Sequence, residues 1–159
     1  MNYRRKARNA GRLLISHGIR LATAESCTGG LLSSWITAIP GSSVYFIGGV
    51  IAYEDLVKTR LLGVSGATLK AYGAVSSQTA AQMADGVRRA LGAQMGVSIT
   101  GIAGPGGARP GKPVGTVFIG LSFKGKARVQ KFFFAGTRAR IRGQSAIAAL
   151  DMIEAALAG

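Results

Sequence analysis

The order of the hydrophobic periodicities constrains the fold of this chain more than any other feature. Up to residue 100, helix-like spacing of apolar residues alternates with short runs rich in β-branched residues. Two further strand-like runs then follow one another, joined only by Lys124-Gly125-Lys126, which is a hairpin signal. This order predicts a three-layer α/β/α fold, in which helices cover both faces of a mixed sheet of about five strands.

The same patterns give approximate element bounds. Helices are expected at 2–17, 31–39, 54–62, 67–72, 77–91 and 138–157. Strands are expected at 19–24, 44–53, 95–100, 114–123 and 127–134. Ser76 and Thr137 are expected to cap the helices that follow them. With 159 residues, no internal repeat and no linker-like segment, the chain is expected to form a single domain, 1–159.

Composition limits the partners and cofactors. One cysteine cannot form an internal disulfide, and one histidine with six carboxylates leaves little material for a metal cage. No apolar run reaches the roughly 20 residues that span a bilayer. The apolar stretch between Arg12 and Arg20 is too short for a signal peptide and contains His17 and Gly18. We therefore expect a cytoplasmic protein with no metal and no membrane partner.

The net charge of +14 points to an anionic partner, either nucleic acid or a small anion. The basic residues are scattered, however, and aromatic residues do not alternate with them as in a base-stacking surface. A solvated basic surface is the preferred interpretation, with one or two arginines directed at a phosphate. A basic nucleic-acid-binding module is the less favoured alternative.

The stretch ATAESCTGGLLSSW, 22–35, is the first candidate for chemistry. A strand enters a turn and then a helix, which would expose Ser26, Cys27 or Thr28 beside free backbone N–H groups, as at an oxyanion hole. The alternative is structural: Ser26 or Thr28 caps the helix and Glu25 lies at its positive end. Local sequence leaves both open.

A serine nucleophile needs a base. The only histidine, His17, lies near the end of an exposed-looking helix and is a poor candidate. Lys58 is a better one, because it follows an apolar strand and has apolar neighbours, and burial favours a neutral amine. Tyr53, five residues earlier, could face the same site. A solvated Lys58 is the alternative.

The second candidate is the loop 101–115, which contains six glycines and three prolines and follows a predicted strand. Gly106 to Lys112 formally matches the phosphate-binding pattern GxxxxGK. Pro113 stands where a magnesium-binding Ser or Thr would be, and a strand follows instead of a helix, so we reject the match. We expect either a flexible surface turn or a backbone that approaches a ligand closely.

Several stretches of the chain resemble the C-terminal domain of the CinA competence/damage-inducible family. They read AESCTGGLLSSWITAIPGSSVYFIGGVIAY (24–53), KTRLLGVSGATLKAYGAVSSQTAAQMADGVRRALGA (58–93), SITGIAGPGG with KPVGTVFIGL (98–121), and FAGTRARIR (134–142). Characterised members are nicotinamide mononucleotide deamidases. The resemblance implies the same fold and hydrolysis of the carboxamide of nicotinamide mononucleotide to nicotinate mononucleotide and ammonia, without a cofactor. Full-length members carry a further N-terminal domain, so we expect this chain to be a stand-alone form.

The resemblance also implies residue roles. Ser26 would be the nucleophile, Lys58 its base and Tyr53 a hydrogen-bonding partner between them, while Cys27 faces the core. On physical grounds we place the oxyanion hole at the backbone of Thr28, Gly29 and Gly30. The nucleotide pocket would be lined by Thr100, Gly101, Ala103 and Gly104. Arg142 would bind the phosphate in a bidentate contact.

One departure from the family bears on the phosphate. The family often has Gly-Asp-Arg where this chain has Gly136-Thr137-Arg138. If that aspartate orients an arginine, Thr137 weakens the assignment of Arg142. We expect a homo-oligomer that acts on a small molecule rather than on nucleic acid. A relative that binds nucleotides without turnover remains a second alternative.

Overall fold

The computed structural model describes residues 2–158 and contains one mixed sheet of five strands, in the order β2-β1-β3-β4-β5. The strands are β1 Leu21–Glu25, β2 Phe46–Ile51, β3 Met95–Gly101, β4 Thr116–Phe123 and β5 Lys126–Phe133. Strand β1 is parallel to both β2 and β3, whereas β4 is antiparallel to β3 and to β5. The mixed five-stranded sheet predicted from the sequence is confirmed.

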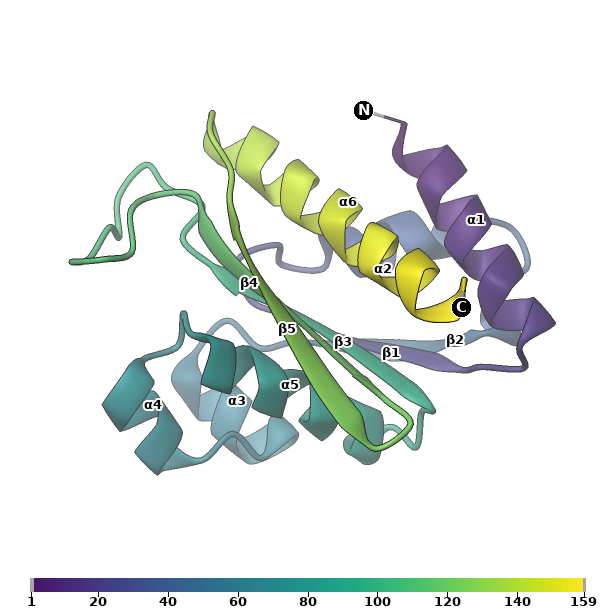
Figure 1. The fold of residues 1–159 in the computed structure, drawn as a ribbon, viewed down its shortest axis with the longest axis horizontal. Coiled ribbons are helices and arrows are strands. Elements are labelled where there is room, and N and C mark those ends of the chain that lie inside the picture. The colour runs from purple at the N-terminus through teal and green to yellow at the C-terminus, as the bar shows by residue number, and fades with distance from the viewer. Residues whose placement is uncertain (1, 159) are drawn as a thin grey trace.

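Helices cover both faces of this sheet, as Figure 1 shows. They are α1 Tyr3–Ser16, α2 Leu31–Thr37, α3 Asp55–Leu62, α4 Gly66–Tyr72, α5 Ser77–Ala90 and α6 Arg138–Leu157, with a 3₁₀ turn η1 at Ser42–Val44. Helices α1, α2 and α6 lie on one face, and α3, α4 and α5 on the other. The three-layer prediction is therefore confirmed, as are the caps: Ser76 Oγ accepts from Thr79 N, and Thr137 Oγ1 from Arg140 N.

Two apolar clusters, one on each face, hold the layers together. Side chains alternate across a strand, so Leu21 joins the cluster under α1, α2 and α6, while Ala22 joins the cluster under α3 and α5. Every residue of β1 is buried because helices cover both of its faces. On β4, a Cβ added to Gly120 would lie 2.5 Å from the carbonyl oxygen of Ala80. A glycine there lets α5 pack close to the sheet.

The element bounds differ from the expected ones where local packing overrides the periodicity. The strand expected at 44–53 is shorter, because η1 occupies Ser42–Val44 and Tyr45 is buried against α1 at Gly11. The hairpin turn is confined to Lys124 and Gly125, whose positive φ angles of 51° and 73° give the primed turn that suits twisted strands.

The topology brings several distant segments to one edge of the sheet. The parallel strands β1, β2 and β3 all end at this edge, β4 begins there, and β5 ends there and leads into α6. The carboxyl ends of parallel strands are where α/β folds collect ligands. Across residues 2–158, no helix is both long enough and apolar enough to cross a membrane.

Candidate active site

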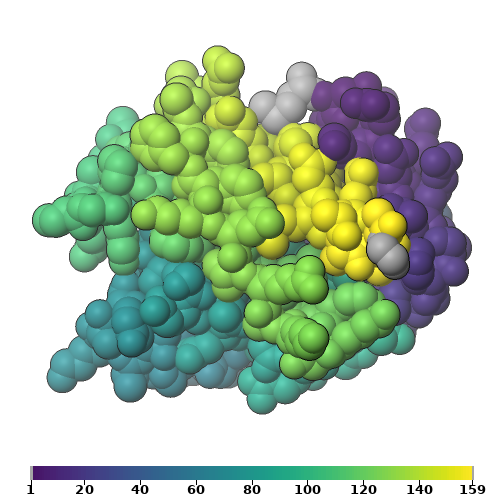
Figure 2. Space-filling model, in the orientation of Figure 1, coloured from purple at the N-terminus to yellow at the C-terminus, as the bar shows by residue number. Residues whose placement is uncertain are grey.

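A cleft of about 620 Å³ opens at this edge of the sheet. Its walls come from the turn after β1, the start of α3, the end of α4, the loop 101–115 and the start of α6. In the space-filling view the loop lies at the left of the molecule, above the helices of the α3–α5 layer (Figure 2). The two candidate segments of the sequence, 22–35 and 101–115, therefore meet in one cleft.

Ser26 lies directly after β1 and lines this cleft with 9% of its surface exposed. Its N–H donates to the carbonyl oxygen of Ile99 at 2.9 Å, so the main chain at Ser26 is still paired with β3. No hydrogen bond engages its hydroxyl within residues 2–158. The hydroxyl is thus held by a rigid backbone and is available to a ligand.

The turn that follows Ser26 needs glycine. Gly29 and Gly30 have φ angles of 57° and 94°, in the left-handed region that other residues rarely adopt. Arg142 of α6 fixes the same turn from outside: its Nε donates to the Cys27 carbonyl at 3.1 Å and its Nη2 to the Thr28 carbonyl at 2.6 Å.

Glu25 lies at the positive end of helix α2, as the structural alternative from the sequence expected, and it also caps the helix, which was not expected. Its buried carboxylate accepts hydrogen bonds from the N–H groups of Gly30, Leu32 and Ser33 and from the Ser33 hydroxyl, at 2.6–3.1 Å. A carboxylate at this end of a helix also meets the positive end of the helix dipole. Neither Ser26 nor Thr28 caps the helix, whose N-cap is Gly30.

This capping revises the expected oxyanion hole. The N–H of Gly30 donates to Glu25, and that of Gly29 donates to the Ser26 carbonyl at 3.1 Å, so neither is free to bind an oxyanion. The N–H groups of Cys27 and Thr28 have no partner within residues 2–158. Of the three residues expected to form the oxyanion hole, Thr28 keeps a free N–H. The N–H of Cys27, the residue directly after Ser26, is a second free donor.

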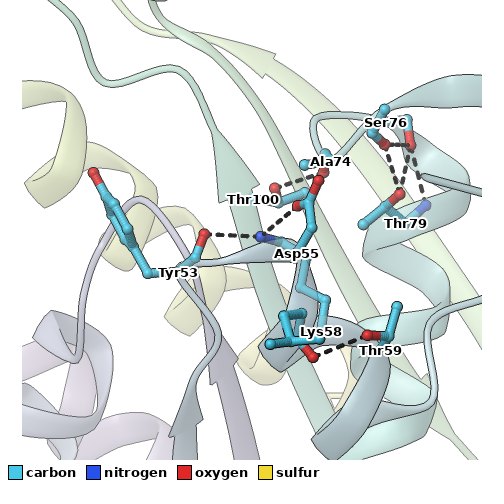
Figure 3. Close-up of polar contacts among 10 residues, drawn as sticks. Tyr53, Asp55, Lys58, Thr59, Ala74, Ser76, Thr79 and Thr100 are labelled. Atoms are coloured by element: carbon cyan, nitrogen blue, oxygen red, sulfur yellow. Dashed lines mark hydrogen bonds and ion pairs between the residues drawn. The ribbon is translucent and has the colours of Figure 1, made fainter. Parts of the chain in front are cut away.

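Lys58 is one of the largest fully buried side chains, with 1% of its surface exposed. Its Nζ donates to the backbone carbonyl of Tyr53 at 3.1 Å and to Asp55 Oδ1 at 3.3 Å (Figure 3). Burial of Lys58 was expected, but the paired carboxylate was not. Lys58 does not line the cleft itself, although both of its partners do.

The Tyr53 side chain does not lie where the resemblance implied. Figure 3 shows its ring directed away from Lys58, and its hydroxyl accepts from Arg138 Nη2 at 3.2 Å. Its backbone carbonyl, rather than its hydroxyl, contacts Lys58 because α3 begins at Asp55 and folds the lysine back toward the end of β2. Tyr53 still lines the cleft.

Arg138 is a cleft residue that the sequence analysis missed. It lies at the first position of α6, and its Nη1 donates to the Gly104 carbonyl at 2.8 Å. One guanidinium thus joins the loop 101–115 to Tyr53. Arg138 could have been predicted from its place directly after the Thr137 cap. The helix that follows the last strand begins where that strand ends, which is the ligand-binding edge of the sheet.

The remaining site predictions divide into two groups. Gly101, Ala103 and Gly104 line the cleft, as expected. Thr28, Gly29, Gly30, Thr100 and Arg142 lie outside its lining. Thr100 Oγ1 donates instead to the Ala74 carbonyl at 2.8 Å, which ties β3 to the segment before α5 (Figure 3). Arg142 uses its guanidinium on the Ser26 turn rather than presenting it to a ligand.

The cleft is strongly cationic. Four basic side chains line it, Lys70, Arg109, Lys112 and Arg138, against one carboxylate, Asp55, which is paired with Lys58. Such a lining attracts anions and not cations. The residues 2–158 contain no cluster of three or more histidine, cysteine or acidic side chains that could hold a metal ion.

Cys27 is an unsuitable nucleophile in this setting. Burial raises the pKa of its thiol to about 11, so the reactive thiolate is scarce near neutral pH. Cys27 is 6% exposed and, although it also lines the cleft, it packs in the cluster under α1, α2 and α6, as expected. Of the three adjacent candidates, Ser26 is the one that lines the cleft, lies outside this apolar cluster and has a free hydroxyl.

Comparison with known proteins identifies relatives of the whole chain. Residues 4–157 match the CinA C-terminal domain. A CinA-like protein from Kosmotoga olearia is 48% identical over 145 residues, which are 91% of this chain and 35% of that protein. The chain spans about a third of the length of the curated relatives it matches.

Solved structures agree over the full fold. A CinA superfamily protein from Klebsiella pneumoniae superposes with a TM-score of 0.96 at 33% identity, covering 99% of both chains. A competence/damage inducible protein from Agrobacterium tumefaciens gives a TM-score of 0.95 at 37% identity, covering 100% of this chain and 97% of that one.

Proposed function

The chain belongs to the CinA C-terminal domain family, and we propose that it is an amidohydrolase that converts nicotinamide mononucleotide to nicotinate mononucleotide and ammonia. The observation that carries this proposal is the position of the free Ser26 hydroxyl in a cleft lined by four cations. A nucleophile beside such a lining suits a substrate with a reactive carbonyl at one end and an anionic group at the other. Nicotinamide mononucleotide has a carboxamide and a phosphate in this relation.

In the first half of the reaction, Ser26 Oγ attacks the carboxamide carbon and its proton passes to Lys58. The carbonyl oxygen becomes an oxyanion, which the N–H groups of Cys27 and Thr28 are free to bind. Lys58 then returns the proton to the departing nitrogen as the C–N bond breaks, which releases ammonia and leaves an acyl-Ser26 ester.

In the second half, water attacks the ester carbon and gives a proton to Lys58. The bond to Ser26 Oγ breaks, the serine recovers a proton from Lys58, and nicotinate mononucleotide leaves. We assign the base to Lys58 because its Nζ contacts Tyr53 and Asp55, which both line the cleft beside Ser26. Asp55 and the Tyr53 carbonyl hold this amine in place.

Arg138 and the Tyr53 hydroxyl form a polar pair on the cleft wall, 3.2 Å apart, and we assign to them the positioning of the pyridine and ribose. The pair also fixes Gly104, through the contact of Arg138 with its carbonyl. Substrate positioning of this kind acts by holding the carboxamide near the serine in an attack geometry.

Release of ammonia from nicotinamide mononucleotide by the purified protein tests the proposal. Ser26→Ala should abolish release, Lys58→Met should lower kcat by at least about 100-fold, and Cys27→Ala should retain activity. Wild-type protein that releases no ammonia from the mononucleotide, or Ser26→Ala protein as active as wild type, refutes the assignment. A panel with nicotinamide, its riboside and the mononucleotide shows which part of the substrate is recognised.

A further inference from the structure

The loop 101–115 contains a small turn that places two positive charges side by side. Arg109 and Lys112 form an isolated antiparallel bridge, with Arg109 N donating to Lys112 O at 3.0 Å and Lys112 N to Arg109 O at 2.8 Å. Directly paired residues of an antiparallel bridge project their side chains to the same side. Both side chains line the cleft.

Like charges placed opposite each other in a β pair are destabilising unless something compensates them. Within residues 2–158, neither cation has an acidic partner: Lys112 Nζ donates to the neutral carbonyl of Tyr72 at 2.8 Å, and Arg109 has no side-chain hydrogen bond. Asp55, the one carboxylate of the lining, is paired with Lys58. The turn therefore holds two cations together that no acidic group of residues 2–158 neutralises.

A third cation faces the same space from a different element. Lys70 lies in the last turn of α4 and lines the cleft, and no ion pair or hydrogen bond engages it within residues 2–158. The contact from Lys112 to Tyr72 O fastens the loop to the end of this helix. The backbone positions of the three basic residues are therefore set by the fold, and Lys112 Nζ is held as well.

Backbone donors complete the arrangement. Gly106 and Gly107 also line the cleft, and their N–H groups have no partner within residues 2–158. A Cβ added at Gly106 would meet nothing within 4 Å, so the main chain there is open to a close approach. Unpaired N–H groups of a glycine-rich loop beside several cations form a concavity suited to an anion.

We propose that Lys70, Arg109 and Lys112, with the Gly106-Gly107 backbone, bind the phosphate monoester of the substrate, so that this face of the loop determines preference for a phosphorylated nucleotide over its nucleoside. The inference rests on the proposed function, in which the carboxamide lies at Ser26. In this assignment Lys70, Arg109 and Lys112 bind the phosphate, in place of the Arg142 expected from the sequence. Arg138 remains with Tyr53 and Gly104 at the Ser26 end.

The test compares two double variants that each remove two positive charges. The variant Lys70→Gln/Arg109→Gln removes two charges from the cleft. The control variant, Arg8→Gln/Arg12→Gln, removes two charges from exposed positions on α1. Calorimetric Kd values for nicotinamide mononucleotide and nicotinamide riboside are measured in a Ser26→Ala background, so that binding is read without turnover. Lys112 is left intact because it also fastens the loop.

The cleft variant should raise the Kd of the mononucleotide at least about 10-fold, the loss of one to two charge-assisted contacts, and leave the riboside Kd unchanged. The α1 variant should change neither Kd by more than about twofold. An equal rise of the mononucleotide Kd in the two variants overturns the site, since the overall positive charge of the protein would then explain the binding. Equal loss for mononucleotide and riboside overturns it too, because the phosphate would not be the recognised group.

The two proposals fail separately. Wild-type protein that releases no ammonia but binds the mononucleotide through Lys70 and Arg109 refutes the reaction and supports the phosphate site. For the second proposal, kcat/KM for the mononucleotide is divided by kcat/KM for the riboside, in wild type and in Lys70→Gln/Arg109→Gln. If both proteins release ammonia and this preference is the same in both, the phosphate site is refuted and the reaction stands. A charge-retaining variant, Arg109→Lys, should keep most of the preference and shows that loss in the glutamine variant is not misfolding.

Discussion

Arg142 Nη2 lies 2.6 Å from the carbonyl oxygen of Thr28, a residue 114 positions earlier in the chain. The contact joins the second turn of α6 to the loop that presents Ser26. Because Nε of the same guanidinium binds the Cys27 carbonyl, the carbonyl groups of the two residues after the serine are fixed by one side chain. A planar guanidinium can hold two carbonyl groups at once, which an ammonium group cannot do in the same geometry.

Arg142→Lys should therefore lower kcat for ammonia release about 10-fold and change KM by less than about twofold, since positioning of the nucleophile acts mainly on the chemical step. Steady-state kinetics with nicotinamide mononucleotide measure both values, with Arg140→Lys, an exposed neighbour on α6, as the control. A raised KM with unchanged kcat would instead restore Arg142 as a phosphate contact.

Glu25→Gln should destabilise the fold by about 2–3 kcal/mol, because a buried amide cannot accept the four hydrogen bonds that the carboxylate receives and loses the favourable charge at the start of α2. Urea unfolding at pH 7 measures the difference. Glu54→Gln, at an exposed N-cap whose side chain makes no capping bond, is the matched control and should change stability by less than about 0.5 kcal/mol. Similar losses in both variants would contradict the capping role.

Asp85 should make stability depend on pH in the acid range. The hydrogen bond from Arg88 lowers the pKa of Asp85, with further lowering by Ser122 and Arg89. Because the pKa of Asp85 in the folded state lies below 3.8, the contribution of Asp85 to the free energy of unfolding is complete above the unfolded pKa. This contribution is lost as pH falls through the folded pKa. Asp85→Asn should cost about 0.5–1 kcal/mol at pH 7, after solvent screening of a partly exposed group. The cost should begin to shrink as pH falls below the unfolded pKa and should keep shrinking as pH falls through the lowered folded pKa.

Unfolding curves of wild type and Asp85→Asn at pH 7, 5, 4 and 3 follow this difference. A cost that stays the same from pH 7 to pH 3 would mean that side-chain shape, and not charge, accounts for it.

Cys27 should resist alkylation in the folded protein. Its thiol pKa of about 11, raised by burial from 9.0, leaves roughly 100-fold less thiolate at pH 8 than an ordinary thiol would have. Iodoacetamide at pH 8 should modify the native protein at least about 100-fold more slowly than the urea-unfolded chain, and the native rate should rise as pH approaches 11. Rapid modification at pH 8 with loss of activity would reopen the choice between Cys27 and Ser26.

The fold could be predicted from the sequence because its signals are local. The apolar runs of β1 and β3, the caps at Ser76 and Thr137 and the Lys124-Gly125 turn each act within a few residues. The shortened β2 was not predictable in this way. Its start depends on the packing of Tyr45 against Gly11, a contact between α1 and a residue far along the chain.

The candidate site was predicted less completely, for a related reason. Ser26 and the glycine-rich loop could be selected because a strand-to-turn pattern marks each of them. The Arg138–Tyr53 contact spans 85 residues, and the Arg142–Thr28 contact 114. No spacing rule tells which of the three arginines on α6 enters the cleft and which supports a turn. The use of the Gly30 amide by Glu25 was equally hidden, because it follows from the exact placement of one carboxylate.

The position of β3 in the middle of the sheet has a consequence for the folding of the site. Its parallel pairing with β1 joins residues 74 positions apart, as in Leu21 and Met95, and non-local pairings of this kind form slowly because a long loop must close first. Until β3 has inserted between β1 and β4, the Ser26 turn and the loop 101–115 have no common edge on which to meet. Recovery of ammonia release during refolding should therefore lag behind the far-ultraviolet signal of the helices and report the completion of the sheet.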